Sequence, residues 1–210
     1  MTGRRVLCTQ GHGDHASLLA VALPALERYA DRHHFDLHIV RHRVAPERPA
    51  AWDKVALLRA LVDDYETVGW IDADAIIVDG APDIAAACDP SRSVHLVEHR
   101  IAQQRIPNSG VMVLTEPKAA TRLLDRLWTK REYTHHRWWE NAALLDLLGY
   151  SVTPPVYPVR PSRWRRLIGR LDHAWNSIPA DPSPRPYIRH FPGLPIGDRL
   201  HEMQMVSSSA

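Results

Sequence analysis

The hydrophobic positions of the chain follow two periods, one typical of buried strands and one typical of helices. Apolar runs at 5–9, 68–78, 93–98 and 111–114, and an alternating stretch at 35–40, predict strands. Helical spacing over 15–32, 51–63, 117–130 and 138–148 predicts helices between them, with Pro117 suited to a first helical turn. Because strands alternate with helices, we expect an α/β fold with a mainly parallel sheet and helices on both faces.

Regular structure is harder to assign elsewhere. A short helix is expected around 82–88, whereas the polar stretch 99–107 carries no predicted element. From residue 154 the chain is rich in Pro and Arg but too apolar to be disordered, so it is expected to wrap back over the sheet. The 210 residues suit one domain, predicted to span 1–198 with halves at about 1–98 and 99–198, followed by a flexible tail at 199–210.

The run 68–78 holds two carboxylates, Asp72 and Asp74, one on each side of Ala73. Asp is unfavourable in strands and costly to bury unless it is paired or bound to a cation. Such a pair after a strand suits a divalent metal, which leaves other coordination positions open for a phosphate-bearing substrate. An ordinary turn with Asx hydrogen bonds explains the same residues, and the spacing alone does not separate the two interpretations.

Composition and charge narrow the function classes. The formal charge of +2 gives no reason to expect a nucleic-acid partner, and no run approaches the roughly 18 apolar residues of a membrane span. The two cysteines are predicted to be free thiols, which fits a reducing compartment and a cytoplasmic location.

Two further positions suggest nucleotide chemistry. Thr9 ends the first predicted strand and Gln10 begins a Gly-containing loop, the place where open α/β sheets bind nucleotides. Lys54, near the start of the second helix, is either a solvated charge or a cation directed at a phosphate.

Five motifs together resemble a known family. They are Ala-Trp-Asp-Lys at 51–54, Trp-Ile-Asp-Ala-Asp-Ala-Ile-Ile at 70–77, Pro-Asn-Ser-Gly-Val at 107–111, Trp-Trp-Glu-Asn-Ala-Ala at 138–143 and Arg-His-Phe-Pro-Gly at 189–193. Their order and spacing over roughly 50–195 resemble the galactosyl transferase GMA12/MNN10 family. That resemblance implies a single-domain GT-A fold, a Rossmann-like sheet, and retaining glycosyl transfer.

The resemblance also implies roles for individual residues. Asp72, Asp74 and His190 would be the metal ligands, with Asp72 and Ala73 at the nucleotide. Lys54 would face the donor diphosphate. The remaining assignments are catalytic for Glu140 and Asn141, and substrate-binding for Trp52, Asn108, Ser109, Trp139 and Gly193. Ser109 stands where the family commonly has Thr, and Asn141 where it commonly has Gln, so contacts to the sugar differ.

The implied reaction moves a hexose or pentose from a nucleotide sugar to a hydroxyl or amine of a small-molecule, peptide or glycan acceptor. UDP is the expected nucleotide, with GDP as the alternative, and Mn²⁺ or Mg²⁺ is the expected cofactor. The cation and Lys54 would stabilise charge on the leaving diphosphate. Double displacement with Glu140 as nucleophile and attack from the leaving-group face both remain open, and Glu140 also reads as a helix N-terminal acid.

Two rival interpretations concern the same Asp-Ala-Asp. Haloacid-dehalogenase phosphatases also place Asp-x-Asp after a strand, but near the start of the domain and followed by Thr or Val, whereas Ala75 follows here. A non-catalytic module that binds a nucleotide sugar or glycan is the second alternative.

Overall fold

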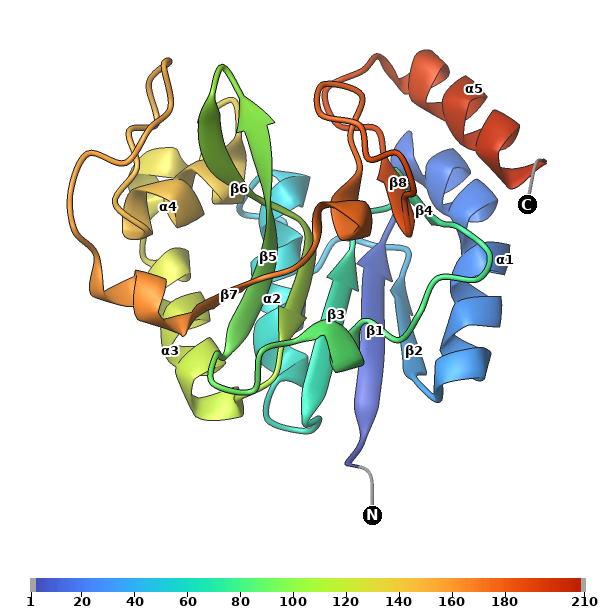
Figure 1. Cartoon of the computed structure of the whole chain (residues 1–210), viewed down its shortest axis with the longest axis horizontal. Helices are drawn as coiled ribbons and strands as arrows, with labels where there is room; N and C mark the ends of the chain where they lie inside the picture. The colour runs from blue at the N-terminus through green and yellow to red at the C-terminus, as the bar shows by residue number, and fades with distance from the viewer. Residues whose placement is uncertain (1–2, 209–210) are drawn as a thin grey trace.

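A computed structural model describes residues 3–208 and contains a six-stranded sheet between two layers of other elements (Figure 1). The sheet strands are β1 (Arg5–Gln10), β2 (Asp36–Val40), β3 (Thr67–Ile71), β5 (Val94–Ile101), β6 (Gln104–Leu114) and β7 (Ile168–Arg170). A separate pair is formed by β4 (Ala75–Ile77) and β8 (Ile188–His190). The α-helices are α1 (His15–His33), α2 (Asp53–Leu61), α3 (Pro117–Trp128), α4 (Trp139–Leu147) and α5 (Ile196–Ser207).

The described residues also form the short 3-10 helices η1 (Ala50–Trp52), η2 (Ala85–Ala87), η3 (Arg131–Tyr133), η4 (Arg163–Leu167) and η5 (His173–Asn176). In the described chain no helix is long and apolar enough to cross a membrane. The helix expected at 82–88 is shorter than predicted and consists only of the single turn η2.

The strand order is β2-β1-β3-β6-β5-β7. Strand β1 pairs in parallel with β2 and β3, and β5 pairs in parallel with β7. Only β6 runs against its neighbours, antiparallel to both β3 and β5. The expectation of a mainly parallel α/β sheet is confirmed, with β6 as the reversed strand.

Alternation along the strands assigns side chains to the two faces of the sheet. Val68 and Trp70 of β3 pack in the cluster that holds α2, α3 and α4, whereas Ile71 packs in the cluster that holds α1, β4 and β8. Figure 1 shows the same division, with α3 and α4 on one side of the sheet and α1 and α5 on the other. Because both faces are covered, β3 is buried along its whole length.

Two further regions differ from the sequence-based expectation. The polar stretch 99–107 extends β5 and β6 into a hairpin whose turn residues, Ala102 and Gln103, both have positive φ (48° and 63°). Such a two-residue turn usually carries Asn-Gly or a similar pair, so Ala-Gln gave no turn signal.

The expected flexible tail is the second difference, because residues 199–207 belong to α5. Met203 of α5 is fully buried and packs with Leu18 of α1 and with Phe191. Because Leu18 lies far from α5 in sequence, the local pattern of residues did not predict this helix. Residues 209–210 of the expected tail lie outside the described residues.

Candidate functional site

The two carboxylates Asp72 and Asp74 occupy the turn between β3 and β4. The Asp72 N–H donates to the Gly110 carbonyl (2.9 Å), and the Ala75 N–H donates to the Asp72 carbonyl (3.1 Å). These bonds close the turn at the carboxyl end of β3, with Ala73 buried between the two acids. Asp74 is buried, while the Asp72 side chain is about a quarter exposed.

His190 reaches this turn from the far end of the chain. Strand β8 pairs antiparallel with β4 in a register that places His190 opposite Ala75, and the Phe191 N–H donates to the Asp74 carbonyl (3.0 Å). The imidazole packs against Gly110, where a Cβ atom would lie 2.2 Å from His190 Cε1. Any larger residue at 110 would therefore displace His190.

A chain of hydrogen bonds assigns the tautomer of His190. The Gly110 backbone N–H donates to Asn108 Oδ1 (2.8 Å), so the amide group of Asn176 that is 2.9 Å from Asn108 Oδ1 is its Nδ2 donor. Asn176 Oδ1 consequently faces His190 Nδ1 at 2.8 Å and accepts its proton. In a neutral imidazole the Nε2 atom then carries a lone pair.

That Nε2 atom lies 3.2 Å from Asp74 Oδ1 and 3.7 Å from Asp72 Oδ2. Three electron-pair donors therefore face one another in a buried place, an arrangement that needs a proton on Nε2 or a cation between them. Two carboxylates and one imidazole whose other nitrogen is held by an amide suit Mn²⁺ or Mg²⁺. The three residues expected as metal ligands thus form one cluster whose donor set fits such an ion.

Lys54 joins this cluster to the first turn of α4. Its ammonium lies 2.9 Å from Asp72 Oδ1, 2.9 Å from Glu140 Oε1 and 3.0 Å from the Ser109 carbonyl. Burial by itself would lower the pKa of Lys54, but Asp72 and Glu140 raise it above its usual range. All three protons of the ammonium have protein acceptors, so the geometry favours a bridging role over the expected contact with a diphosphate.

Asp74 has a cationic neighbour, Arg199 of α5, whose Nη1 lies 2.9 Å from Asp74 Oδ2. Burial would raise the pKa of Asp74, but His190 and Arg199 lower it well below its usual range. Sequence reasoning missed Arg199 because it falls in the segment expected to be a flexible tail. It also missed Asn176, a fully buried residue in the Pro- and Arg-rich region that showed no recognisable motif.

The residues expected at the transferred sugar lie side by side. Ser109 donates its hydroxyl to Glu140 Oε1 (3.1 Å) and its backbone N–H to Asn141 Oδ1 (3.0 Å), which ties β6 to α4. Asn108 is bound to Gly110 and Asn176, as described above. Asn108, Ser109, Glu140 and Asn141 are therefore brought together at the β6 side of the metal-ligand cluster.

Three other expected substrate residues have different surroundings. Trp52 has no exposed surface and packs in the core, with its indole N–H 3.3 Å from the Thr134 carbonyl, so a substrate contact is wrong for it. Trp139 is 43% exposed, whereas Trp138 is partly buried against the core. Gly193 has a φ of 77°, which allows the turn between β8 and α5 but places no side chain in the site.

Thr9 and Gln10 end β1 beside the β2–α2 loop. Thr9 is buried, and the Gln10 amide N–H group donates to Asp53 Oδ2 (2.8 Å) and to the His42 carbonyl. Asp53 is fully buried and accepts further bonds from the Arg43 guanidinium. The Gln10 nitrogen is therefore committed to holding this loop, and Asp53, which sequence reasoning quoted only as part of a motif, is its anchor.

The fold of this chain is similar to that of several solved glycosyltransferase structures. A glycosyltransferase involved in glycosylation of the major capsid of PBCV-1 superposes with a TM-score of 0.65 at 13% identity, covering 95% of this chain and 99% of that one. The galactosyltransferase LgtC, in complex with donor and acceptor sugar analogs, gives 0.63 at 10% identity and covers 97% and 95%. Mouse xyloside xylosyltransferase 1 gives 0.55 at 12% identity over 91% and 100%. The chain has the GT-A glycosyltransferase fold.

The similarity to known proteins is one of fold and not of sequence. No protein-family model and no curated protein matches the chain in sequence, so membership of the GMA12/MNN10 family stays a prediction. Within this GT-A fold, the Asp-Ala-Asp turn follows β3 at the carboxyl ends of the parallel strands, the edge where open α/β sheets bind ligands.

Proposed function

We propose that this protein is a metal-dependent retaining glycosyltransferase that moves a hexose or pentose from a nucleotide sugar, UDP-linked by preference, to an acceptor hydroxyl or amine. The observation that carries the proposal is the close approach of the side chains of Asp72, Asp74 and His190, joined through buried Lys54 to Glu140. A metal site therefore adjoins a carboxylate and two amides, the side chains that recognise sugar hydroxyls.

The proposed roles follow from the contacts. Asp72, Asp74 and His190 hold a divalent cation, which supplies charge stabilisation for a leaving diphosphate. Lys54 and the Trp70 indole N–H, at 2.9 Å and 2.6 Å, fix Asp72 Oδ1 and leave Oδ2 directed at His190. Glu140 is buried and oriented by Lys54 and Ser109, so its carboxylate is held in place beside Asn141 and the metal-ligand cluster.

A donor screen tests the proposal. The purified protein is incubated with Mn²⁺ and a panel of UDP- and GDP-sugars, and release of the nucleoside diphosphate is followed with and without candidate acceptors. We expect slow release with one donor, and a loss of roughly 100-fold or more in Asp74→Asn, because a metal ligand is replaced. Asp79→Asn, an exposed acid beyond β4, is the matched control and keeps wild-type release.

The other outcomes contradict the proposal in different ways. Donor binding with no diphosphate release in the presence of any acceptor indicates a binding module. Cleavage of a phosphomonoester indicates a phosphatase. Release that continues unchanged in Asp74→Asn removes the metal site from the reaction.

A further inference from the structure

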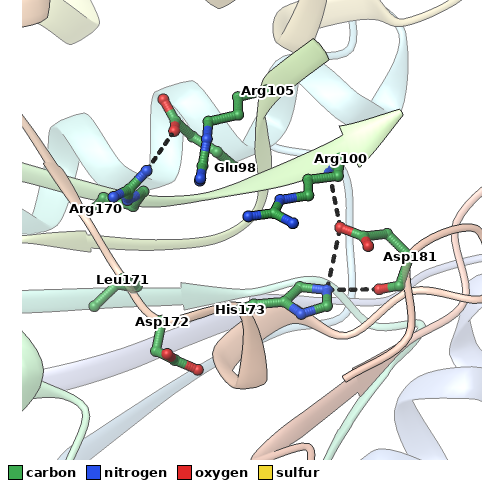
Figure 2. Close-up of a pocket in the computed structure, with 8 residues that line it drawn as sticks. All are labelled: Glu98, Arg100, Arg105, Arg170, Leu171, Asp172, His173 and Asp181. Carbon is green, nitrogen blue, oxygen red and sulfur yellow. Dashed lines mark hydrogen bonds and ion pairs between the residues drawn. The ribbon is translucent and has the colours of Figure 1, made fainter. Parts of the chain in front are cut away.

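A second group of metal-ligand side chains lies outside the proposed donor site, beside a cavity of about 320 Å³. It consists of His99 near the end of β5, His173 in η5 and Asp181 in the following turn. Figure 2 shows His173 and Asp181 pointing toward each other at the wall of this cavity, with Asp181 between His173 and the β5 backbone at Arg100. The chain brings these three residues together from two distant segments.

His99 is the observation that requires an explanation. Its side chain is 2% exposed, and neither ring nitrogen has a hydrogen-bond partner among the described residues. A buried polar group without a partner costs roughly 1–3 kcal/mol, and a bound ion is one of the explanations for such a group in a native protein. Asp181 Oδ2 lies 3.8 Å from His99 Nδ1.

The distances within the cluster suit a small tetrahedral cation. Asp181 Oδ2 lies 3.2 Å from His173 Nε2, and one ligand atom from each of the three residues lies within 4.8 Å of the others. Two ligands of a tetrahedral zinc ion, each about 2.0–2.1 Å from the metal, are roughly 3.3 Å apart. The Asp181–His173 pair already has this spacing, whereas His99 Nδ1 lies 3.8 Å from Asp181 Oδ2 and would have to move closer to complete the site.

We propose that His99, His173 and Asp181 form a second metal site that binds Zn²⁺, with its fourth position open to the cavity. Two imidazoles and one carboxylate favour zinc over manganese or magnesium, which prefer oxygen-rich sets. The Arg100 backbone N–H donates to Asp181 Oδ2 (2.7 Å) and holds the carboxylate in place. His173 Nε2 donates to the Asp181 carbonyl (2.6 Å), and a bound ion would take the place of that proton.

The position of this site gives it a structural role toward the first one. Asn176 and Ser177 lie between His173 and Asp181. Asn176 Oδ1 accepts from His190 Nδ1 (2.8 Å), and the Ser177 carbonyl accepts from the His190 backbone N–H (2.8 Å). A zinc ion bound to His99, His173 and Asp181 ties segment 173–181 to β5 and so fixes the residues that orient His190.

The test uses a variant in which two carboxylates of the Asp72–Asp74–His190 site are removed, so that metal binding at the second site is measured alone. The Asp72→Asn/Asp74→Asn protein is stripped of metal and titrated with Zn²⁺ against a chromogenic chelator, and Co²⁺ is used as a spectroscopic probe of tetrahedral geometry. We expect one equivalent of Zn²⁺ and a tetrahedral Co²⁺ spectrum. Adding His173→Gln or His99→Gln removes both signals, whereas adding His38→Gln, an exposed histidine of β2, changes neither.

His173 is one-third exposed, so His173→Gln serves as the main variant if His99→Gln does not fold. If the double Asp variant itself does not fold, the same comparison in the wild-type background takes bound zinc from two equivalents to one. Zinc binding that is absent in the parent, or unchanged by His173→Gln, overturns the proposal. Zinc should also raise the melting temperature of the parent and leave that of His173→Gln unchanged.

Discussion

At the scale of single residues, the candidate site depends on Lys54 more than on any other side chain. It is the buried cation shared by Asp72 and Glu140, which come from opposite ends of the site. Removing one partner of a buried ion pair leaves an uncompensated charge, which is more costly than loss of a surface pair. The lysine therefore stabilises the fold and the site at once.

Lys54→Met tests this. We expect it to lower the free energy of unfolding by about 3–5 kcal/mol, because two carboxylates lose their counter-ion. Urea denaturation in the presence of a chelator gives the measurement. Arg59→Ala, which breaks exposed pairs with Asp63 and Asp125, is the control and should change stability by less than about 1 kcal/mol. A small effect of Lys54→Met would show that the pair is not essential to stability.

Asp53 predicts a pH dependence. Burial would raise its pKa, but hydrogen bonds from Arg43, Gln10 and two backbone N–H groups lower it below its usual range. A depressed pKa contributes stability above the unfolded value, about 3.9, and that contribution is lost as pH falls through the folded pKa. The stability gap between wild type and Asp53→Asn should therefore be full above about pH 5 and narrow below about pH 4.

Chemical denaturation between these pH values measures the gap. Asp31→Asn, an exposed acid of α1, is the control and should show no such dependence. A gap that stays constant down to the lowest pH would show that Asp53 does not titrate abnormally in the folded protein.

At the scale of elements, α5 connects the C-terminus to the candidate metal site. It packs on α1 through Met203 and places Arg199 on Asp74. Arg199 would therefore compete with a bound metal for one of the proposed ligands.

Arg199→Ala should raise the affinity for Mn²⁺ in the absence of nucleotide by roughly tenfold, about 1.4 kcal/mol, since a like charge is removed. With a nucleoside diphosphate present, the same change should weaken binding, because a positive group near the anion is lost. Calorimetric titration measures both affinities, and Arg28→Ala, which breaks an exposed pair with Asp79, is the control. Weaker Mn²⁺ binding in both titrations would contradict competition.

At the scale of the whole molecule, the candidate site draws on segments distributed along nearly the full chain. Lys54 comes from α2, Asp72 from the β3–β4 turn, Glu140 from α4 and His190 from β8. A ligand that binds all of them stabilises the folded state as a unit.

Mn²⁺ and UDP are each added at about 100 times the dissociation constant. Each ligand should then raise the free energy of unfolding by at most about 2.7 kcal/mol. Thermal melts with and without a chelator measure the shift. In Asp74→Asn the shift should vanish, while in Asp79→Asn it should equal that of wild type. A wild-type shift in Asp74→Asn would place the metal elsewhere.

Local pattern was sufficient for most of the sheet and its helices. The burial of β3, the alternating strand β2 and the helix that begins at Pro117 are properties of short windows. In α3, Glu116 accepts from the backbone N–H groups of Lys118 and Ala119, so the first turn is closed by residues adjacent in sequence. The Asp-Ala-Asp pair was also evident, because acids inside an apolar run break a local rule.

Only the tertiary structure decided which side chains meet. The order of the motifs did not show that Lys54 is enclosed by Asp72 and Glu140, or that Trp52 is wholly buried. Asn176, Arg199 and the His99–His173–Asp181 cluster carry no local signature, since each acquires its surroundings from residues distant in sequence. Periodicity records whether a residue faces the core, whereas the partner it finds there depends on how the sheet and its covering elements pack.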